Sequence, residues 1–249
     1  VEPGEGYPYR EIIQNFKKGM TAEQVATMIV KQYAASYNGG SAGSSSTTQS
    51  VVKCSELDNL TDAINGFAKA TMAGDFAAEF KSALNRVQKF YYRTNIDLGH
   101  FVALTKASIN DEGFQTAANK FEAAYAKAVT YNGLSGYNTK NATGLAIYFP
   151  TSSYSFSAEY KDLAFAKNCM WEAMVKDYNK KAAVKTLVAD VSRGDMSSLM
   201  DYVATANEKN REVSAHVIAK LNFSVFAEGN LDDSTRTNVS NLLNELKAR

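Results

Sequence analysis

The chain contains two cysteines and two histidines, the residue types that form a thiolate nucleophile and its base: Cys54, Cys169, His100 and His216. Such a pair works only when the thiolate lies beside the imidazole. Cys54 lies in a predicted strand and Cys169 in a predicted helix, away from any turn that would present a nucleophile. We therefore predict a buried strand residue at Cys54, a helix residue at Cys169 and ordinary polar or half-buried histidines, with no catalytic residue in this chain.

The chain opens with Val-Glu-Pro-Gly-Glu-Gly-Tyr-Pro-Tyr over residues 1–9, which places two carboxylates in a stiff loop. The two prolines fix their own φ angles, and the two glycines permit positive φ or a close approach of the backbone. A rigid acidic loop can bind a cationic side chain. Taken alone, the residues favour the alternative, an ordinary turn with Glu2 and Glu5 solvated. The run carries no initiator methionine or signal peptide, so we expect a processed product or a portion of a longer protein.

Other kinds of chemical site find little support in the sequence. It has no glycine-rich phosphate loop, no His-x-x-x-His metal pair and no serine nucleophile elbow. Two cysteines make neither a disulfide framework nor a zinc spacing. The acidic pairs 111–112 and 232–233 are interpreted as charges at helix N-termini rather than as metal ligands.

Composition is that of an ordinary globular protein, with 45% hydrophobic and 21% charged residues among 249. This length allows one large domain or one and a half. The net charge of +1 gives no indication of a nucleic-acid surface or a polyanionic partner. No apolar run approaches the roughly 20 residues that a membrane span requires.

Helices are expected to dominate and to position these residues. Thr21 and Gln24 predict a capping box that opens a helix ending near Tyr37. Residues 38–49 are rich in glycine and serine and predict a flexible loop. Strands are predicted over 50–56 and 143–149, as neighbours in one sheet, with a Gly/Asn loop over 132–141.

Apolar residues at helical spacing predict further helices in both halves of the chain. Four stripes precede residue 130: Leu57, Leu60, Ile64 and Phe67; Phe76, Phe80, Leu84, Val87 and Tyr91; Leu98, Phe101 and Val102; Phe114, Phe121, Tyr125 and Val129. A helix over 157–179 follows, and then a small bundle with helices over 182–192, 196–210 and 238–247. Residues 213–226 fit either a strand or a helix, and we favour a helix.

Three segments carry a resemblance to a known family. They are the opening run, the segment Asn95-Ile96-Asp97-Leu98, and Gly144-Leu145-Ala146-Ile147-Tyr148-Phe149-Pro150 near a later Trp171. Together, and in this order, they resemble clostripain-like cysteine peptidases, a bacterial family with a caspase-like fold. The resemblance covers roughly residues 1–178.

The resemblance implies a helix-rich α/β fold, the outer part of a caspase-like α/β/α sandwich with a C-terminal helical extension. The peptidase portion would span 1–179, with the flexible loop at 38–49, and the extension 180–249. In the family, the catalytic His and Cys turns both precede the Glu-Pro-Gly run, so the dyad would lie upstream of this chain. The parent enzyme would cleave after Arg or Lys through a thioester intermediate, and this chain alone would be inactive.

The resemblance also assigns a substrate-binding role to the opening loop. In the clostripain-like peptidases, this loop borders the pocket that accepts the basic side chain of the substrate. Glu5 is the first candidate for the wall of this pocket and Glu2 the second, with Pro3, Gly4 and Tyr7 shaping it. An acidic group facing a guanidinium makes a charge-assisted hydrogen bond.

Partners, cofactors and location follow from the same resemblance. The partners would be the upstream catalytic portion and peptide or protein substrates containing Arg or Lys, with no nucleic acid and no membrane span. No cofactor or metal is required, although the family permits calcium. The location would be secreted, periplasmic or on a bacterial cell surface. The pairs Lys17-Lys18 and Lys180-Lys181 are solvated charges by default and self-cleavage candidates in such an enzyme.

Two alternatives remain open on the sequence. The chain could be a non-catalytic interaction module whose aromatic-rich helices pack against a partner. It could also be a degenerate peptidase homologue that has kept the scaffold and lost the nucleophile.

Overall fold

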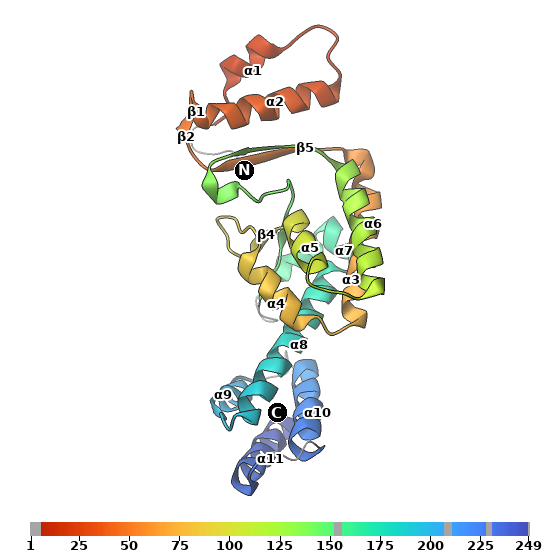
Figure 1. The fold of residues 1–249 in the computed structure, drawn as a ribbon, viewed down its shortest axis with the longest axis vertical. Helices are drawn as coiled ribbons and strands as arrows, with labels where there is room; N and C mark the ends of the chain where they lie inside the picture. Colours follow the sequence, from red (N-terminus) through yellow and green to blue (C-terminus); the bar gives the residue numbers. More distant parts are fainter. Residues whose placement is uncertain (1–5, 152–155, 207–210, 228–230, 249) are drawn as a thin grey trace.

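The computed structural model describes residues 6–151, 156–206, 211–227 and 231–248. Glu2, Pro3, Gly4 and Glu5, four of the five predicted substrate-binding residues, lie outside this part of the chain. The protein is elongated, with an upper tier of α1, α2 and two strand pairs, a central tier, and a helical bundle at the far end (Figure 1).

The helices and strands give a helix-rich α/β fold, as predicted. The α-helices are α1 (Tyr9–Asn15), α2 (Ala22–Ser36), α3 (Leu57–Ala73), α4 (Ala77–Arg86), α5 (Leu98–Lys106), α6 (Glu112–Ala128), α7 (Ala164–Asn168), α8 (Trp171–Ser192), α9 (Ser197–Thr205), α10 (Arg211–Ala227) and α11 (Asp233–Ala248). The 3-10 turns are η1 (Cys54–Glu56), η2 (Tyr137–Thr139) and η3 (Ala158–Asp162). The strands are β1 (Asn38–Gly40), β2 (Gly43–Ser44), β3 (Thr47–Val52), β4 (Asn95–Asp97), β5 (Val129–Ser135) and β6 (Ala146–Tyr148).

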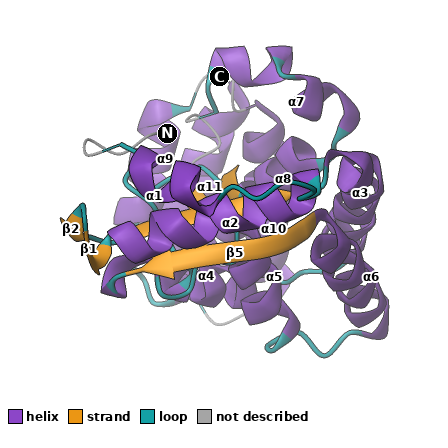
Figure 2. Ribbon diagram, turned by 90° about the horizontal axis from the view of Figure 1, so that it is seen from above, coloured by secondary structure: helices purple, strands orange, loops and turns teal. Residues whose placement is uncertain are grey.

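The upper tier is a two-stranded sheet covered by one helix. The predicted capping box opens α2: the Gln24 N–H donates to Thr21 Oγ1 at 3.2 Å, and the Thr21 N–H donates to Gln24 Oε1 at 2.9 Å. Helix α2 lies across the antiparallel pair β3–β5 (Figure 2). The packing is close at Gly133, where an added Cβ would lie 2.7 Å from Val30 Cγ1. Glycine is therefore needed where this helix meets the sheet.

The predicted pairing of the two strands is wrong. Strand β3 pairs with β5, which occupies part of the predicted 132–141 loop, and β6 pairs with β4. Between the predicted neighbours, the Ser50 hydroxyl donates to the Gly144 carbonyl at 2.6 Å. The flexible loop predicted over 38–49 contains regular structure, since these residues form the β1–β2 hairpin and the start of β3, while its flexibility stays a prediction.

The central tier has an aromatic core built by α3–α6, β4, β6 and the first half of α8. Its largest fully buried side chains include six phenylalanines and the single tryptophan: Phe67, Phe80, Phe101, Phe114, Phe121, Phe149 and Trp171. The predicted stripes supply most of this core. Tyr91 is an exception, being 92% exposed because α4 ends five residues earlier, at Arg86.

The far end is a four-helix bundle of the second half of α8 with α9, α10 and α11. Its core is separate and aliphatic, and it includes Val191, Leu199, Leu221 and Leu243. Helices occur at each predicted place in this region, including α10, although 182–192 belongs to α8 and α9 ends at Thr205, before the predicted end at 210. The expected boundary at 179/180 falls within α8, which continues from the aromatic core into the aliphatic one.

Candidate functional site

Both cysteines lie elsewhere than predicted. Strand β3 ends at Val52, so Cys54 is not a buried strand residue but an exposed one at the start of η1. Cys169 follows the last residue of α7 and is buried before α8 begins. Burial raises the pKa of the Cys169 thiol, which disfavours the reactive thiolate.

The two histidines are half-buried, as predicted, and neither is hydrogen-bonded to a cysteine among the described residues. His100 Nδ1 accepts a hydrogen bond from the Gln88 N–H at 3.0 Å, and burial lowers the pKa of its imidazole. Burial also lowers the pKa of His216, on α10, with Lys180 and Lys220 adding to this effect. Both imidazoles therefore favour the neutral form. The described chain assembles no Cys–His pair.

Tyr7 anchors the opening segment where it enters the described fold. Its hydroxyl accepts a hydrogen bond from Gln49 Nε2 at 2.5 Å, and its ring centroid lies 5.2 Å from that of Tyr33. Next to it, the Gly6 carbonyl accepts a bond from the Tyr37 hydroxyl at 2.8 Å. The residue that follows Glu5 is thus fixed against α2 and β3.

A buried carboxylate, Asp97, ties β4 to the segment that leads into β6. Asp97 is fully buried and caps α5 by accepting from the His100 N–H at 2.9 Å. It also accepts from the Thr143 N–H at 2.7 Å and from the Thr143 hydroxyl at 2.5 Å. Three donors satisfy the charge that burial would otherwise make costly.

Tyr125 extends this network to the first residues of the β6 region. Its hydroxyl lies 2.9 Å from Thr143 Oγ1 and accepts from the Leu145 N–H at 3.0 Å. Burial raises the pKa of Tyr125 to about 12. Gly99 leaves room for the contact, because a Cβ there would lie 2.4 Å from Thr143 Oγ1. The position of β6 is therefore set by buried polar contacts as well as by apolar packing.

Among the described residues, strand β6 pairs with β4 along one edge and with no strand along its other edge, which we call the open edge. The Leu98 N–H donates to the Leu145 carbonyl at 2.9 Å, and the Phe149 N–H donates to the Thr94 carbonyl at 2.7 Å. Hydrogen-bonded pairs recur every second residue in an antiparallel ladder, so the main-chain polar groups of Ala146 and Tyr148 point away from β4. Trp171 Nε1 donates to the Tyr148 carbonyl at 2.8 Å. Within the described part of the chain, the N–H and C=O of exposed Ala146 have no hydrogen-bond partner.

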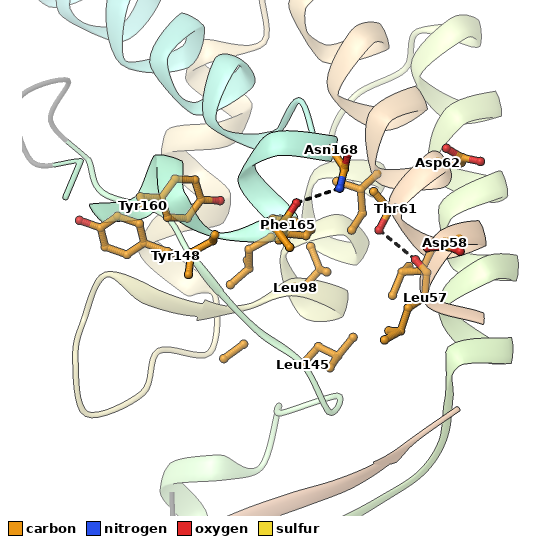
Figure 3. A pocket seen from close by; sticks show the side chains of 16 residues that line it. Leu57, Asp58, Thr61, Asp62, Leu98, Leu145, Tyr148, Tyr160, Phe165 and Asn168 are labelled. Atoms are coloured by element: carbon orange, nitrogen blue, oxygen red, sulfur yellow. Dashed lines mark hydrogen bonds between the residues drawn. The ribbon is translucent and has the colours of Figure 1, made fainter. Parts of the chain in front are cut away.

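A cavity of about 810 Å³ runs beside this open edge (Figure 3). Four consecutive residues, Leu145 to Tyr148, line it. Successive strand side chains point to opposite faces, so a cavity touching all four lies along the edge rather than over one face. The opposite wall comes from α3 and α7, with Leu60, Ile64 and Phe165.

The rim of the cavity adds polar groups to this apolar lining. Asp58 and Asp62 lie on α3 at one end, and Tyr148 and Tyr160 lie at the other (Figure 3). Tyr160 is 8% exposed, and its hydroxyl has no hydrogen-bond partner among the described residues. Burial raises the pKa of Tyr160, so the hydroxyl stays protonated and can donate. The cavity thus combines apolar walls, an open strand edge and a buried hydroxyl without a partner.

The family model for the clostripain family matches residues 1–178. The chain belongs to the clostripain family. No curated protein and no solved structure shows significant similarity to it. The match covers the upper and central tiers, which hold the opening segment, the Asp97 network and the open edge of β6, and it ends within α8 before the aliphatic bundle.

As a clostripain-family chain, the protein is related to cysteine peptidases and hence to proteins that act on polypeptides. Across the described residues, no three His, Cys, Asp or Glu side chains gather as they would around a metal ion. None of the described helices is both long and apolar enough to span a bilayer.

Sequence reasoning missed the main features of this site in the clostripain-family chain. The sequence did contain a signal for the capping role of Asp97, since an aspartate before an apolar helix is a typical N-cap. No sequence signal predicted the contact of Asp97 with Thr143 or the cavity beside β6, because both involve segments far apart in the sequence. The acidic pairs, in contrast, lie as predicted: Asp111 and Asp232 accept hydrogen bonds from the first turns of α6 and α11.

Proposed function

We propose that this chain is the part of a clostripain-like cysteine endopeptidase that follows the catalytic dyad, and that the enzyme cleaves after Arg or Lys. An upstream catalytic portion of the same protein would add a strand to the open edge of β6 and complete a caspase-like sheet. The opening segment would then form one wall of the pocket for the basic side chain.

The open edge of β6 is the observation that carries this proposal. An isolated pair of strands is marginal in water and gains stability when further strands extend it. Ala146 presents its unpaired main chain to a cavity with apolar walls, and Tyr160 adds a buried hydroxyl there. These features suit an added strand, and family membership supports a peptidase as its source.

The upstream portion and this chain would contribute different groups to the reaction. The upstream histidine would act as base and acid, the upstream cysteine would form the thioester, and backbone N–H groups would stabilise the oxyanion. This chain would supply Glu5, and secondarily Glu2, to face the guanidinium or ammonium group of the substrate. Pro3 and Gly4 would shape the loop, and the hydrogen bond of Tyr7 to Gln49 would fix its exit.

Glu5→Ala in the protein with its upstream portion tests the pocket. A charge-assisted contact contributes about 1.5–3 kcal/mol, so kcat/KM for an Arg reporter should fall roughly tenfold to a hundredfold. Glu23→Ala is the matched control, since it removes an exposed glutamate from the first turn of α2 and should leave kcat/KM unchanged. An unchanged preference for Arg over neutral reporters in Glu5→Ala would show that the loop is a structural turn.

Without the upstream portion, this chain should not cleave Arg or Lys reporters, because its described cysteines and histidines form no pair. Turnover that is abolished by Cys54→Ala or Cys169→Ala would contradict this. We further propose an extracytoplasmic bacterial location and self-cleavage after exposed lysines such as Lys17 and Lys18.

A further inference from the structure

The loop after α4 and the η2 segment enclose a second cavity, of about 920 Å³, away from the edge of β6. In Figure 1 this is the region between the yellow loop that precedes β4 and the green turn that follows β5. Four cations line it: Arg86, Lys89, Arg93 and Lys140. None of the described residues that line the cavity is acidic, and none of the four cations forms an ion pair with a described carboxylate. We call this cavity the basic groove.

The fold holds the walls of the basic groove in place through one buried side chain. Gln88 is 8% exposed, and its Nε2 donates to the Asn138 carbonyl at 2.6 Å and to the Lys89 carbonyl at 2.9 Å. Its Oε1 accepts from the Asn141 N–H at 3.3 Å. Across the groove, the Asn138 N–H donates to Ser46 Oγ at 3.1 Å. The cations therefore project from a fixed frame rather than from independent loops.

Four cations without a neighbouring carboxylate among the described residues make the electrostatic potential in the groove positive. Lys89 shows the effect of this potential. Its pKa is lowered by burial and by the charge of Arg93. The chain as a whole has a net charge of only +1, so composition hides this local excess. An anion in the groove would relieve the repulsion and make charge-assisted contacts.

Two further features of the groove point to a ligand. Thr47 lines it and is 9% exposed, and its hydroxyl has no hydrogen-bond partner among the described residues. Tyr91 and Tyr137 line it with rings that are 92% and 76% exposed. The ring of Tyr137 lies 3.9 Å from Lys140 Nζ, which helps to hold that cation in place. Charge, an unpaired hydroxyl and exposed aromatic surface are thus brought together.

We propose that the basic groove binds an acidic stretch of polypeptide, whose carboxylates contact the four cations while its side chains pack on the two tyrosines. Membership of a peptidase family makes a polypeptide the favoured anion over a nucleic acid. The proposal does not depend on cleavage after Arg or Lys. It adds a binding site for acidic segments away from the proposed pocket for basic side chains.

Fluorescence anisotropy with the full chain tests the proposal. The probe is a fluorescein-labelled octapeptide of alternating Glu and Ser, and the comparison probes are the same peptide with Gln for Glu and an oligothymidine of equal charge. We expect the Glu peptide to bind, the Gln peptide not to bind, and added salt to weaken binding. The double variant Lys89→Ala/Arg93→Ala should weaken it roughly tenfold or more.

Lys17→Ala/Lys18→Ala is the matched control, because it removes the same charge from exposed positions outside the groove and should leave the affinity unchanged. Arg93→Glu provides a second variant with an exposed substitution, and it should lose the Glu peptide while it keeps the thermal midpoint. Absence of binding, or equal losses in both double variants, would overturn the site. Tighter binding of oligothymidine than of the Glu peptide would overturn the assignment to polypeptide.

Discussion

The central tier and the C-terminal bundle solve the same packing problem with different residues. The central core is aromatic, and Phe101 contacts the rings of Phe80, Phe149 and Trp171 with centroids 5.1–6.1 Å apart. The described core of the bundle is built from Val, Leu and Ala side chains. The central tier also contains a buried carboxylate and an open strand edge, whereas the bundle closes on itself. The two regions therefore differ in the residues that stabilise them and in the polar groups that they contain, although continuous α8 joins them.

Phe101→Ala should produce the largest effect and should separate the two regions. Removal of a fully buried aromatic ring costs about 3–5 kcal/mol of unfolding free energy. Trp171 is the only tryptophan and lies in the central core, so its fluorescence in urea reports that region. The fluorescence midpoint should fall sharply.

Leu221→Ala is the corresponding variant in the bundle, since Leu221 is fully buried in its core. It should lower bundle stability by about 2–5 kcal/mol. The loss should appear in far-ultraviolet circular dichroism before it appears in Trp171 fluorescence. Equal shifts of both signals in both variants would show that continuous α8 makes the two cores one cooperative unit.

Asp97→Ala should destabilise the central tier next most strongly. It removes the acceptor of three hydrogen bonds, and each buried donor left unpaired costs about 1–3 kcal/mol. Asp97→Asn keeps the shape and one acceptor oxygen, so it should lose less. The midpoint of Trp171 fluorescence in urea checks the order. A loss in Asp97→Ala no larger than in Asp97→Asn would show that the charge and the second acceptor contribute nothing.

Thr21→Ala should have a smaller, local effect in the upper tier. It removes the side-chain half of the capping box of α2, which contributes about 1 kcal/mol. Hydrogen exchange of the first turn of α2 should accelerate, while the bundle stays unchanged. Glu23→Ala again serves as the control, since it removes no cap.

His100→Gln should change how the stability of the central tier depends on pH. Burial lowers the folded-state pKa of His100, so its neutral form stabilises the fold. This contribution is present above the ordinary histidine pKa and is lost as pH falls through the folded pKa. Acid destabilisation of the central tier should therefore be shallower in His100→Gln than in the parent. His216→Gln should affect the bundle instead, and identical acid profiles for His100→Gln and the parent would contradict the prediction.

Local signals in the sequence predicted local structure well. The capping box at Thr21, the acidic N-termini at Asp111 and Asp232, and most helical stripes depend on residues within one or two turns, and all are confirmed. Strand pairing failed because β3 and β5 meet across about eighty residues, and propensity carries no information on such partners. The prediction that Lys181 is solvated is also wrong, because its partners are distant in the sequence. Lys181 Nζ donates to the carbonyls of Met72 and Gly74, where α8 crosses the end of α3.

In the candidate site, too, the sequence predicted local features better than contacts between distant segments. Tyr7 could be singled out from the sequence, and its contacts with Gln49 and Tyr33 show how the opening segment is anchored. The open edge of β6 and the basic groove could not, because each forms where distant segments converge. The net charge of +1 gave no indication of a polyanionic partner, while folding gathers four cations in one groove.

Hydrogen exchange of the Ala146 amide shows whether the open edge of β6 receives a strand from the upstream portion. It should be measured in this chain and in the protein that also contains the upstream catalytic portion. We predict rapid exchange in the chain alone, where the N–H faces the cavity, and strong protection when an added strand supplies its acceptor. Equally fast exchange of Ala146 in both proteins would show that the open edge of β6 receives no strand from the upstream portion.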